Sequence, residues 1–211
     1  MTARVFPWLY DLVMAAAERR WLAPMRARLV AGLGGRVLEV GAGTGLDFPH
    51  YPAAALVVAT EPDVAMLERA RARARQAPAR VLVVAADAEA LPFRDGAFDA
   101  GVVALALCTI PRPQRALEEL RRVLRPGVPL RLLEHVRAPD RRAARMQERL
   151  TPVWRRLAGG CHLDRDTVAE VARAGFTVER LREHAGGVVV EVAASAPLAQ
   201  HRGTGERTRE T

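Results

Sequence analysis

A short apolar run, Val37–Val40, ends abruptly in three glycines that alternate with other residues, Gly41, Gly43 and Gly45. Valine and leucine favour a buried strand, and glycines directly after a strand permit a tight turn and let a ligand lie against bare backbone. We therefore expect a strand, a glycine-rich turn and then a helix. The spacing lacks the third glycine of the G-x-G-x-x-G pattern that binds a pyrophosphate. Because Glu39 would also repel phosphates, a ligand with a cationic or amino group is favoured.

Short apolar runs without polar alternation recur along the chain, as expected of strands that are covered on both faces. Segments with helical spacing separate the first five runs, and this order predicts a parallel sheet with helices on both sides. The last two runs are joined through Gly186-Gly187 and predict an antiparallel hairpin. We therefore expect an α/β fold with a doubly wound, mostly parallel, seven-stranded sheet. The runs are 36–40, 56–60, 80–86, 98–104, 129–134, 176–181 and 188–194.

The predicted sheet lies within a domain at 36–196, after an N-terminal helical cap at 1–35 and before a polar tail at 197–211 that is expected to be disordered. An insertion at 138–165 is expected to form a lid over the substrate. It starts with a basic and apolar helix or helix pair, which Pro152 is expected to break. Its two faces suit an amphipathic or membrane-borne substrate. An ordinary surface helix with arginines on its wet side fits the same pattern.

Arginine supplies all 32 basic residues of the chain, and the net charge is +8. Because lysine is absent, we attribute this usage to a GC-rich genome, and the charge alone is weak support for a nucleic-acid partner. No clustered pattern of arginines and aromatics appears. Cys108 and Cys161 are too few for a disulfide framework and lack metal-site spacing. With no signal peptide or long apolar span, we expect a cytoplasmic protein, and peripheral membrane contact stays open.

An acid follows each of the second and third apolar runs. Glu61 lies 20 residues beyond Gly41, where an acid accepts both ribose hydroxyls in dinucleotide-type folds. Asp87 is placed to accept a hydrogen bond from an adenine amino group, while the backbone of Ala88 bonds the ring. Each acid also has a structural interpretation, since Glu61 could be a solvated loop acid and Asp87 a helix N-cap.

Five ordered segments of the chain resemble the motifs of the class I S-adenosylmethionine-dependent methyltransferases. They are VLEVGAGTG at 37–45, TEPD at 60–63, ADAEALPF at 86–93, FDAGVVALALC at 98–108 and ALEELRRVLRPG at 116–127. The resemblance covers about residues 36–135. It implies a Rossmann-like fold, S-adenosyl-L-methionine as cofactor and methyl transfer to a small acceptor, as in the ubiquinone/menaquinone-type members.

A second, longer resemblance spans about residues 5–180. It rests on LCTIPRPQ at 107–114, LEHVRAP at 133–139, Trp154 and GGCHLDRDT at 159–167. These segments look like the methyltransferase-like thiol methyltransferases, and bacterial phospholipid N-methyltransferases share much of the pattern. The resemblance implies a small-molecule or lipid-like acceptor, namely a thiol, a quinol or an amine. Val128-Pro129 departs from the family, which usually has a second glycine there.

The resemblance also implies roles for individual residues. Glu39 would lie near the amino-acid end of the cofactor, and the three glycines would shape its bed. Leu105 and Cys108 would line the crevice beside the sulfonium. The remaining implied cofactor-binding residues are Glu61, Pro62, Asp87 and Ala88.

Two histidines are candidates for a general base. His135 directly follows the fifth predicted strand, and His162 lies in the GGCHL run. Either could instead be a structural histidine, and Cys108 and Cys161 are expected to be packing residues. No metal ligands are expected.

Three other functions remain in competition. The glycine spacing and Glu39 speak against a nicotinamide oxidoreductase. A non-catalytic S-adenosylmethionine-binding protein has the same binding motifs. An RNA or DNA methyltransferase is suggested only by the charge, because neither cysteine follows a proline and the (N/D)-P-P-(Y/F) run is absent.

Overall fold

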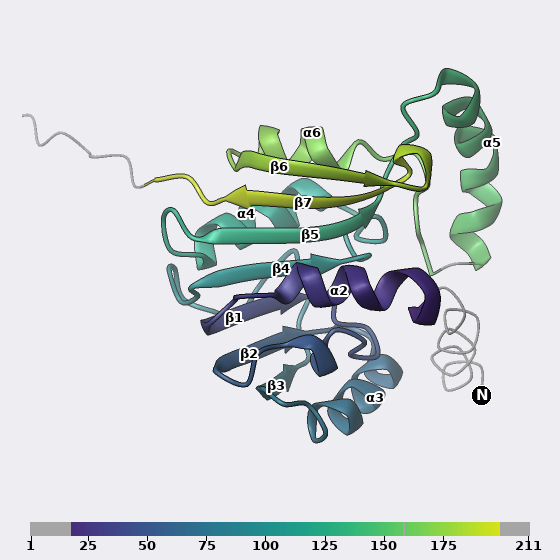
Figure 1. Ribbon diagram of the computed structural model, residues 1–211. Helices are drawn as coiled ribbons and strands as arrows, with labels where there is room; N and C mark the ends of the chain where they lie inside the picture. The colour runs from purple at the N-terminus through teal and green to yellow at the C-terminus, as the bar shows by residue number, and fades with distance from the viewer. Residues whose placement is uncertain (1–17, 158, 199–211) are drawn as a thin grey trace, which may run out of the picture.

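Seven strands form one sheet in the order β3-β2-β1-β4-β5-β7-β6 (Figure 1). This computed structural model describes residues 18–157 and 159–198. Strands β1 to β5 are parallel, and β7 runs antiparallel to both β5 and β6, so the predicted fold is confirmed. The strands are β1 (Gly35–Val40), β2 (Ala55–Thr60), β3 (Arg80–Val84), β4 (Ala100–Ala104), β5 (Pro129–His135), β6 (Thr177–His184) and β7 (Val189–Ser195).

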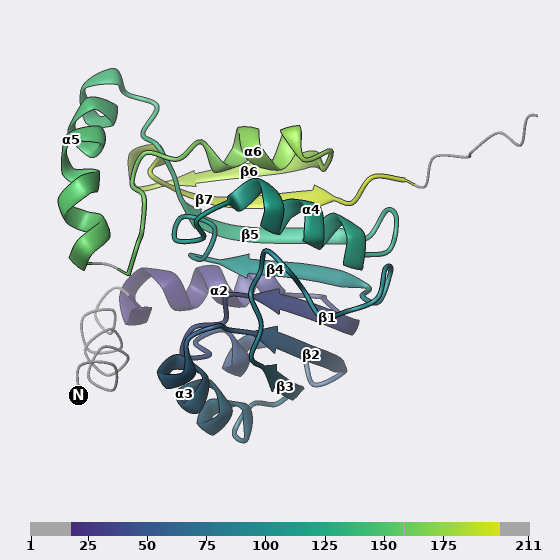
Figure 2. The ribbon, with the colours of Figure 1, turned by 180° about the vertical axis from the view of Figure 1, so that it is seen from behind.

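Helices cover both faces of the sheet, which explains why its strands are continuous apolar runs. Helices α2 and α3 pack on one face, where Leu29 and Ala70 share a core with Val57 (Figure 1). Helices α4 and α6 cover the other face, where Leu117 and Val171 are buried (Figure 2). The helices are η1 (Glu18–Leu22), α2 (Ala23–Val30), α3 (Val64–Ala74), α4 (Pro113–Val123), α5 (Arg141–Leu157) and α6 (Thr167–Arg173).

Two helices begin at an aspartate that caps the first turn. The Asp63 carboxylate accepts a hydrogen bond from the Met66 N–H at 2.9 Å and caps α3. Asp166 accepts from the Ala169 N–H at 3.1 Å and caps α6. Each cap satisfies an N–H that has no partner within its own helix.

The expectation of a helix after the glycines is wrong. Turns follow Gly45, and then a single 3₁₀ turn forms at Phe48–His50. Pro49 and Pro52 explain the difference, because each lacks a backbone N–H and disfavours helical geometry in the residue before it. Tyr51, which precedes Pro52, is accordingly extended.

The expected break at Pro152 is also wrong, because α5 continues through it. Proline removes one helical hydrogen bond, to the carbonyl four residues earlier. Pro152 and Glu148 are both exposed, so water can satisfy the carbonyl that proline leaves open.

Parts of the predicted organisation lie outside the described residues. These are 1–17 of the helical cap and 199–211 of the tail. Over the described ranges, no helix has both the length and the apolar character that a membrane crossing needs. The same residues contain no cluster of acidic, cysteine or histidine side chains suited to a metal ion.

A buried carboxylate holds the loop that follows β4. Glu134 on β5 has no exposed surface. Its Oε1 accepts hydrogen bonds from the N–H groups of Ala106 and Leu107, both at 2.9 Å, and its Oε2 accepts from the Cys108 N–H at 3.4 Å. Burial raises the pKa of Glu134 to about 7, although these bonds oppose the rise. Three successive N–H groups of the loop are therefore bonded to one side chain of the neighbouring strand.

The variant Glu134→Gln tests whether this buried carboxyl group makes the stability of the protein depend on pH. The raised pKa means that the folded state binds the proton more tightly than the unfolded chain. The stability from this group is therefore present at low pH and is lost as pH rises through about 7. We expect the wild-type unfolding free energy to fall by about 3 kcal/mol more than that of Glu134→Gln between pH 5 and pH 8. Urea unfolding followed by circular dichroism measures this difference.

Glu118→Gln is the control, because Glu118 is an exposed glutamate on α4. It should keep the wild-type pH dependence. Equal pH slopes for wild type and Glu134→Gln would contradict the prediction.

Candidate functional site

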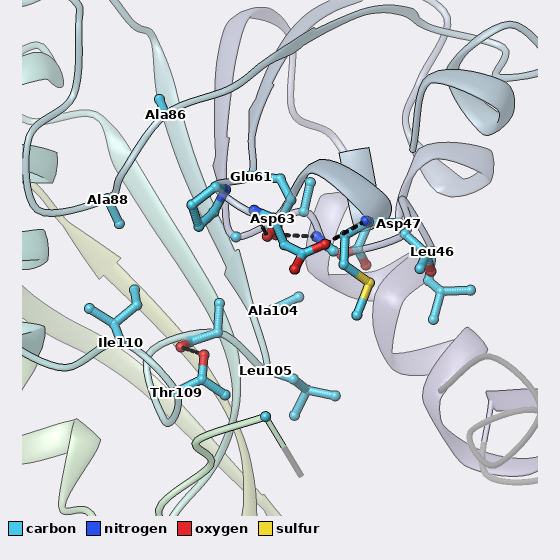
Figure 3. A pocket seen from close by; sticks show the side chains of 18 of the residues that line it. Leu46, Asp47, Glu61, Asp63, Ala86, Ala88, Ala104, Leu105, Thr109 and Ile110 are labelled. Atoms are coloured by element: carbon cyan, nitrogen blue, oxygen red, sulfur yellow. Dashed lines mark hydrogen bonds between the residues drawn. The ribbon is translucent and has the colours of Figure 1, made fainter. Parts of the chain in front are cut away.

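A cavity of about 390 Å³ opens at the edge of the sheet where the parallel strands end (Figure 3). Residues that follow β1, β2, β3 and β4 line it. The strand order reverses here, since β1 lies between β2 and β4. Doubly wound sheets bind ligands at such a reversal, and the volume lies within the ~300–1,000 Å³ of small-molecule sites.

The glycine turn forms one wall of this cavity because side chains are excluded there. Gly41 has φ +71°, and a Cβ on it would collide with the side chain of Ala106. Gly45 has φ +82°, and a Cβ there would lie 2.5 Å from the Phe48 ring. Gly41 and Gly43 line the cavity, whereas Gly45 only shapes the turn behind it.

Glu61 lies at the end of β2 and lines the cavity (Figure 3). Its Oε2 accepts a hydrogen bond from the Gly43 N–H at 2.9 Å, and its Oε1 accepts from the Asp63 N–H at 3.0 Å. Burial raises the pKa of Glu61, and the two N–H groups oppose that rise. Each carboxylate oxygen keeps a second lone pair, so the group can accept from two adjacent hydroxyls.

The turn after β3 brings Asp87 and Ala88 to the cavity, and Pro62 also lines it. Asp87 does not cap a helix. Its Oδ1 accepts from the Glu89 N–H at 2.9 Å, and its carbonyl accepts from the Ala90 N–H at 3.1 Å, which closes a turn. The side chain of Asp87 is exposed, while Ala88 is buried.

The loop after β4 supplies an apolar wall. Leu105 has φ +55°, a strained conformation for a residue with a side chain, and its N–H donates to the Leu133 carbonyl at 2.7 Å. Leu105, Ala106 and Ile110 line the cavity. The turn thus presents apolar residues to the cavity.

Cys108 does not line the cavity, contrary to expectation. It is buried, and its Sγ lies 3.7 Å from the Leu105 carbonyl. Contact with the Cys161 side chain and burial raise the pKa of Cys108 well above its ordinary value. The thiol therefore packs behind the loop.

Neither candidate histidine is among the residues that line the cavity. His135 is paired with Val189 within the sheet, and burial lowers its pKa. His162 lies nearer, because its backbone N–H donates to the Cys108 carbonyl at 2.8 Å and Gly159 on the same loop lines the cavity. Burial and Arg165 lower the pKa of His162.

Two further charged residues, Arg26 and Asp47, also line the cavity, and Figure 3 shows Asp47 on the side away from Ala86 and Ala88. The Arg26 Nη1 donates to both Asp47 oxygens at 3.0 Å, and its Nε donates to Glu18 at 3.0 Å. Glu39 is fully buried and does not line the cavity. Burial and the Asp47 carboxylate raise the pKa of Glu39, although the Tyr51 hydroxyl opposes the rise.

Sequence reasoning missed both Arg26 and Asp47. An acid two residues after the last glycine was a detectable signal for Asp47. The sequence contained no such signal for Arg26, because this residue lies on α2, outside every motif.

These residues fit S-adenosyl-L-methionine. Its ribose diol needs an acceptor such as Glu61, and its adenine needs small apolar surroundings such as Ala86 and Ala88. Its methionyl group carries both an ammonium and a carboxylate, and the paired charges of Arg26 and Asp47 are among the residues that line the cavity.

Comparison with known proteins gives relatives over most of the chain. Residues 38–132 match the family model described as a methyltransferase domain. The human thiol S-methyltransferase TMT1B is 32% identical over 82% of this chain and 75% of its own length. The human thiol S-methyltransferase TMT1A is 33% identical over 84% of this chain and 74% of its own length. A phosphatidylethanolamine N-methyltransferase of Cereibacter sphaeroides is 34% identical over 62% and 63%.

Solved structures share the fold. A putative methyltransferase from Bacillus halodurans has a TM-score of 0.67 at 20% identity, covering 82% of this chain and 98% of its own. The [4+2]-cyclase SpnF has a TM-score of 0.68 at 21% identity, covering 88% and 82%. Since a cyclase shares it, the fold by itself does not specify the reaction. The reaction class is indicated by the matching family model and by the relatives that match most of this chain. The chain therefore belongs to the class I S-adenosylmethionine-dependent methyltransferases.

Proposed function

We propose that this methyltransferase transfers the methyl group to the sulfur of a small apolar thiol. The supporting observation is the wall formed by Leu105, Ala106, Ile110 and Pro111, which carries no charged side chain. An amine arrives as an ammonium, which is costly to bury without a carboxylate partner. A neutral thiol carries no such cost. The relatives named thiol S-methyltransferases also cover more of this chain than the phosphatidylethanolamine N-methyltransferase does.

The placement of the lining residues supports the following cofactor roles. We assign the ribose diol to Glu61, the adenine amino group to Asp87 and the adenine ring to the backbone of Ala88. Arg26 and Asp47 face the methionyl carboxylate and ammonium. Glu39 acts only indirectly, through its effect on Asp47.

S-adenosyl-L-methionine supplies an electrophilic methyl group on a positively charged sulfur. The chain's task is to orient the thiol in line with that bond and to exclude water. The acceptor sulfur forms a bond to the methyl carbon as the sulfonium bond breaks, and the thiol proton must leave. We assign that proton to His162, which stands on the same loop as the cavity-lining Gly159 and whose pKa is lowered by burial and by Arg165.

Glu61→Gln should weaken binding of both S-adenosylmethionine and S-adenosylhomocysteine by about 10- to 100-fold. The amide keeps the size of the side chain but loses the charge and one accepting oxygen, and a hydrogen bond to a charged group contributes about 1.5–3 kcal/mol. Isothermal titration calorimetry measures both affinities. Glu68→Gln, at an exposed glutamate on α3, should bind as wild type does. An affinity for Glu61→Gln within twofold of wild type would refute the assignment.

His162→Gln should lower kcat for a small alkyl thiol by at least about tenfold at pH 7, with KM for the cofactor unchanged. The deficit should shrink toward pH 9–10, because a thiol with a pKa of about 8.5 or higher then ionises unaided. Rates of thioether formation across pH measure this effect. His135→Gln is the control and should follow the wild-type profile. A deficit that is constant with pH would show a structural role for His162.

A further inference from the structure

Helix α5 turns small and polar side chains toward the protein. Gln147 and Thr151 are buried. The Gln147 Oε1 accepts from the Ala138 N–H at 2.7 Å, and its Nε2 donates to the Val136 carbonyl at 3.1 Å. The Thr151 hydroxyl donates to the Gln147 carbonyl at 2.8 Å and lies 3.3 Å from the Asp164 carboxylate. Polar contacts therefore fix which face of α5 points outward.

The large apolar side chains of α5 are exposed. Met146, Leu150, Val153 and Trp154 retain between 44% and 59% of their accessible surface. Offsets of four, seven and eight residues place them in one stripe along the helix. A surface helix usually buries such a stripe against the protein. In α5 the apolar side chains are exposed and polar side chains are buried instead. A contiguous exposed apolar surface of this kind marks an interaction site.

A basic face adjoins the apolar stripe. α5 contains six arginines and one glutamate. Arg142, Arg145, Arg149 and Arg156 are exposed, and offsets of three, seven and fourteen residues align them beside the stripe. The single acid, Glu148, is paired with Arg137 at 2.6 Å. The outward surface of α5 is therefore both apolar and cationic.

We propose that α5 lies in the plane of an anionic lipid bilayer surface. Apolar side chains enter the boundary between headgroups and acyl chains, tryptophan favours that depth, and arginines reach lipid phosphates while their stems cover apolar surface. A protein partner with an apolar surface would not by itself supply negative charges opposite the aligned arginines. A nucleic acid would leave the apolar stripe exposed. The proposal goes beyond methyl transfer and does not depend on the acceptor.

The position of α5 would bring a bound bilayer close to the cavity. The helix stands beyond the edge of the sheet on which the cavity opens (Figures 1 and 2). Gly159, two residues after α5, lines the cavity. Its neighbour Gly160 faces the loop after β4, since a Cβ on Gly160 would lie 3.6 Å from the Thr109 carbonyl oxygen. A bilayer bound by α5 would place apolar acceptors near the mouth of the cavity.

Vesicle flotation of the full chain tests the proposal. The probes are vesicles of phosphatidylcholine alone and vesicles of three parts phosphatidylcholine to one part phosphatidylglycerol. We expect binding to the anionic vesicles, weakened by salt, and little binding to phosphatidylcholine. Absence of binding to the anionic vesicles at low salt would overturn the proposal.

Matched variants separate α5 from the rest of the surface. The double variant Leu150→Ser/Val153→Ser should bind anionic vesicles at least about tenfold more weakly. Leu181→Ser/Val64→Ser removes one exposed leucine and one exposed valine elsewhere and should bind as wild type does. Equal losses in the two variants, or no loss in either, would refute a role for α5.

Charge reversal tests the basic face in the same way. Arg142→Glu/Arg149→Glu should weaken binding at least about thirtyfold. Arg71→Glu/Arg75→Glu, at exposed arginines at the end of α3, should have a much smaller effect. Loss of RNA binding in the α5 variant, with vesicle binding unchanged, would instead assign this surface to nucleic acid.

Calorimetry with S-adenosylhomocysteine shows that each variant is folded and separates this proposal from the proposed reaction. None of the substituted residues lines the cavity, so cofactor affinity should stay at the wild-type value. Lost vesicle binding with intact cofactor binding supports the membrane surface. Failure of thiol methylation with intact vesicle binding refutes only the proposed acceptor.

Discussion

The loops that follow β1 and β4 touch where Gly41 meets Ala106, and only a residue without a side chain allows that approach. Glu134 fixes the second loop by accepting hydrogen bonds from three successive N–H groups. A buried carboxylate that satisfies several donors at once is worth more than separate exposed contacts, because each donor would otherwise be buried without a partner. The cavity wall at Leu105 depends on both constraints.

The acids around the cavity have different tasks because their surroundings differ. Glu61 is bonded to two N–H groups and still faces the ligand. Glu39 lies deeper, beside another carboxylate, and does not reach the cavity. Two glutamates that each follow or end a strand can therefore have different roles. Glu61 is placed to contact a ligand directly, whereas Glu39 can affect it only through neighbouring residues.

Arginine serves several structural purposes in this chain. Arg122 on α4 donates to the carbonyls of Leu91 and Phe93 and pairs with Glu119 and Asp95. Arg26 is buried between two carboxylates. On α5 most arginines instead project outward in a row. The net charge is therefore a poor guide to function, whereas the local arrangement on α5 is informative.

The sequence determined the order of the seven strands along the chain and the glycine turn, because apolar runs and glycine spacing are local signals. It also indicated Glu61, Asp87 and Ala88, since residues after parallel strands meet at one edge of the sheet. The tertiary structure decided how deep each side chain lies. It moved Glu39, Cys108 and His135 away from the cavity and brought in Arg26 from a separate helix.

Helix α5 shows the same division. Its sequence contains both apolar and basic faces, but either face could have been buried. Contacts of Gln147 and Thr151 with distant backbone and side chains decided that the apolar stripe points outward. Periodicity identifies the faces of a helix, whereas only long-range contacts determine which face is buried.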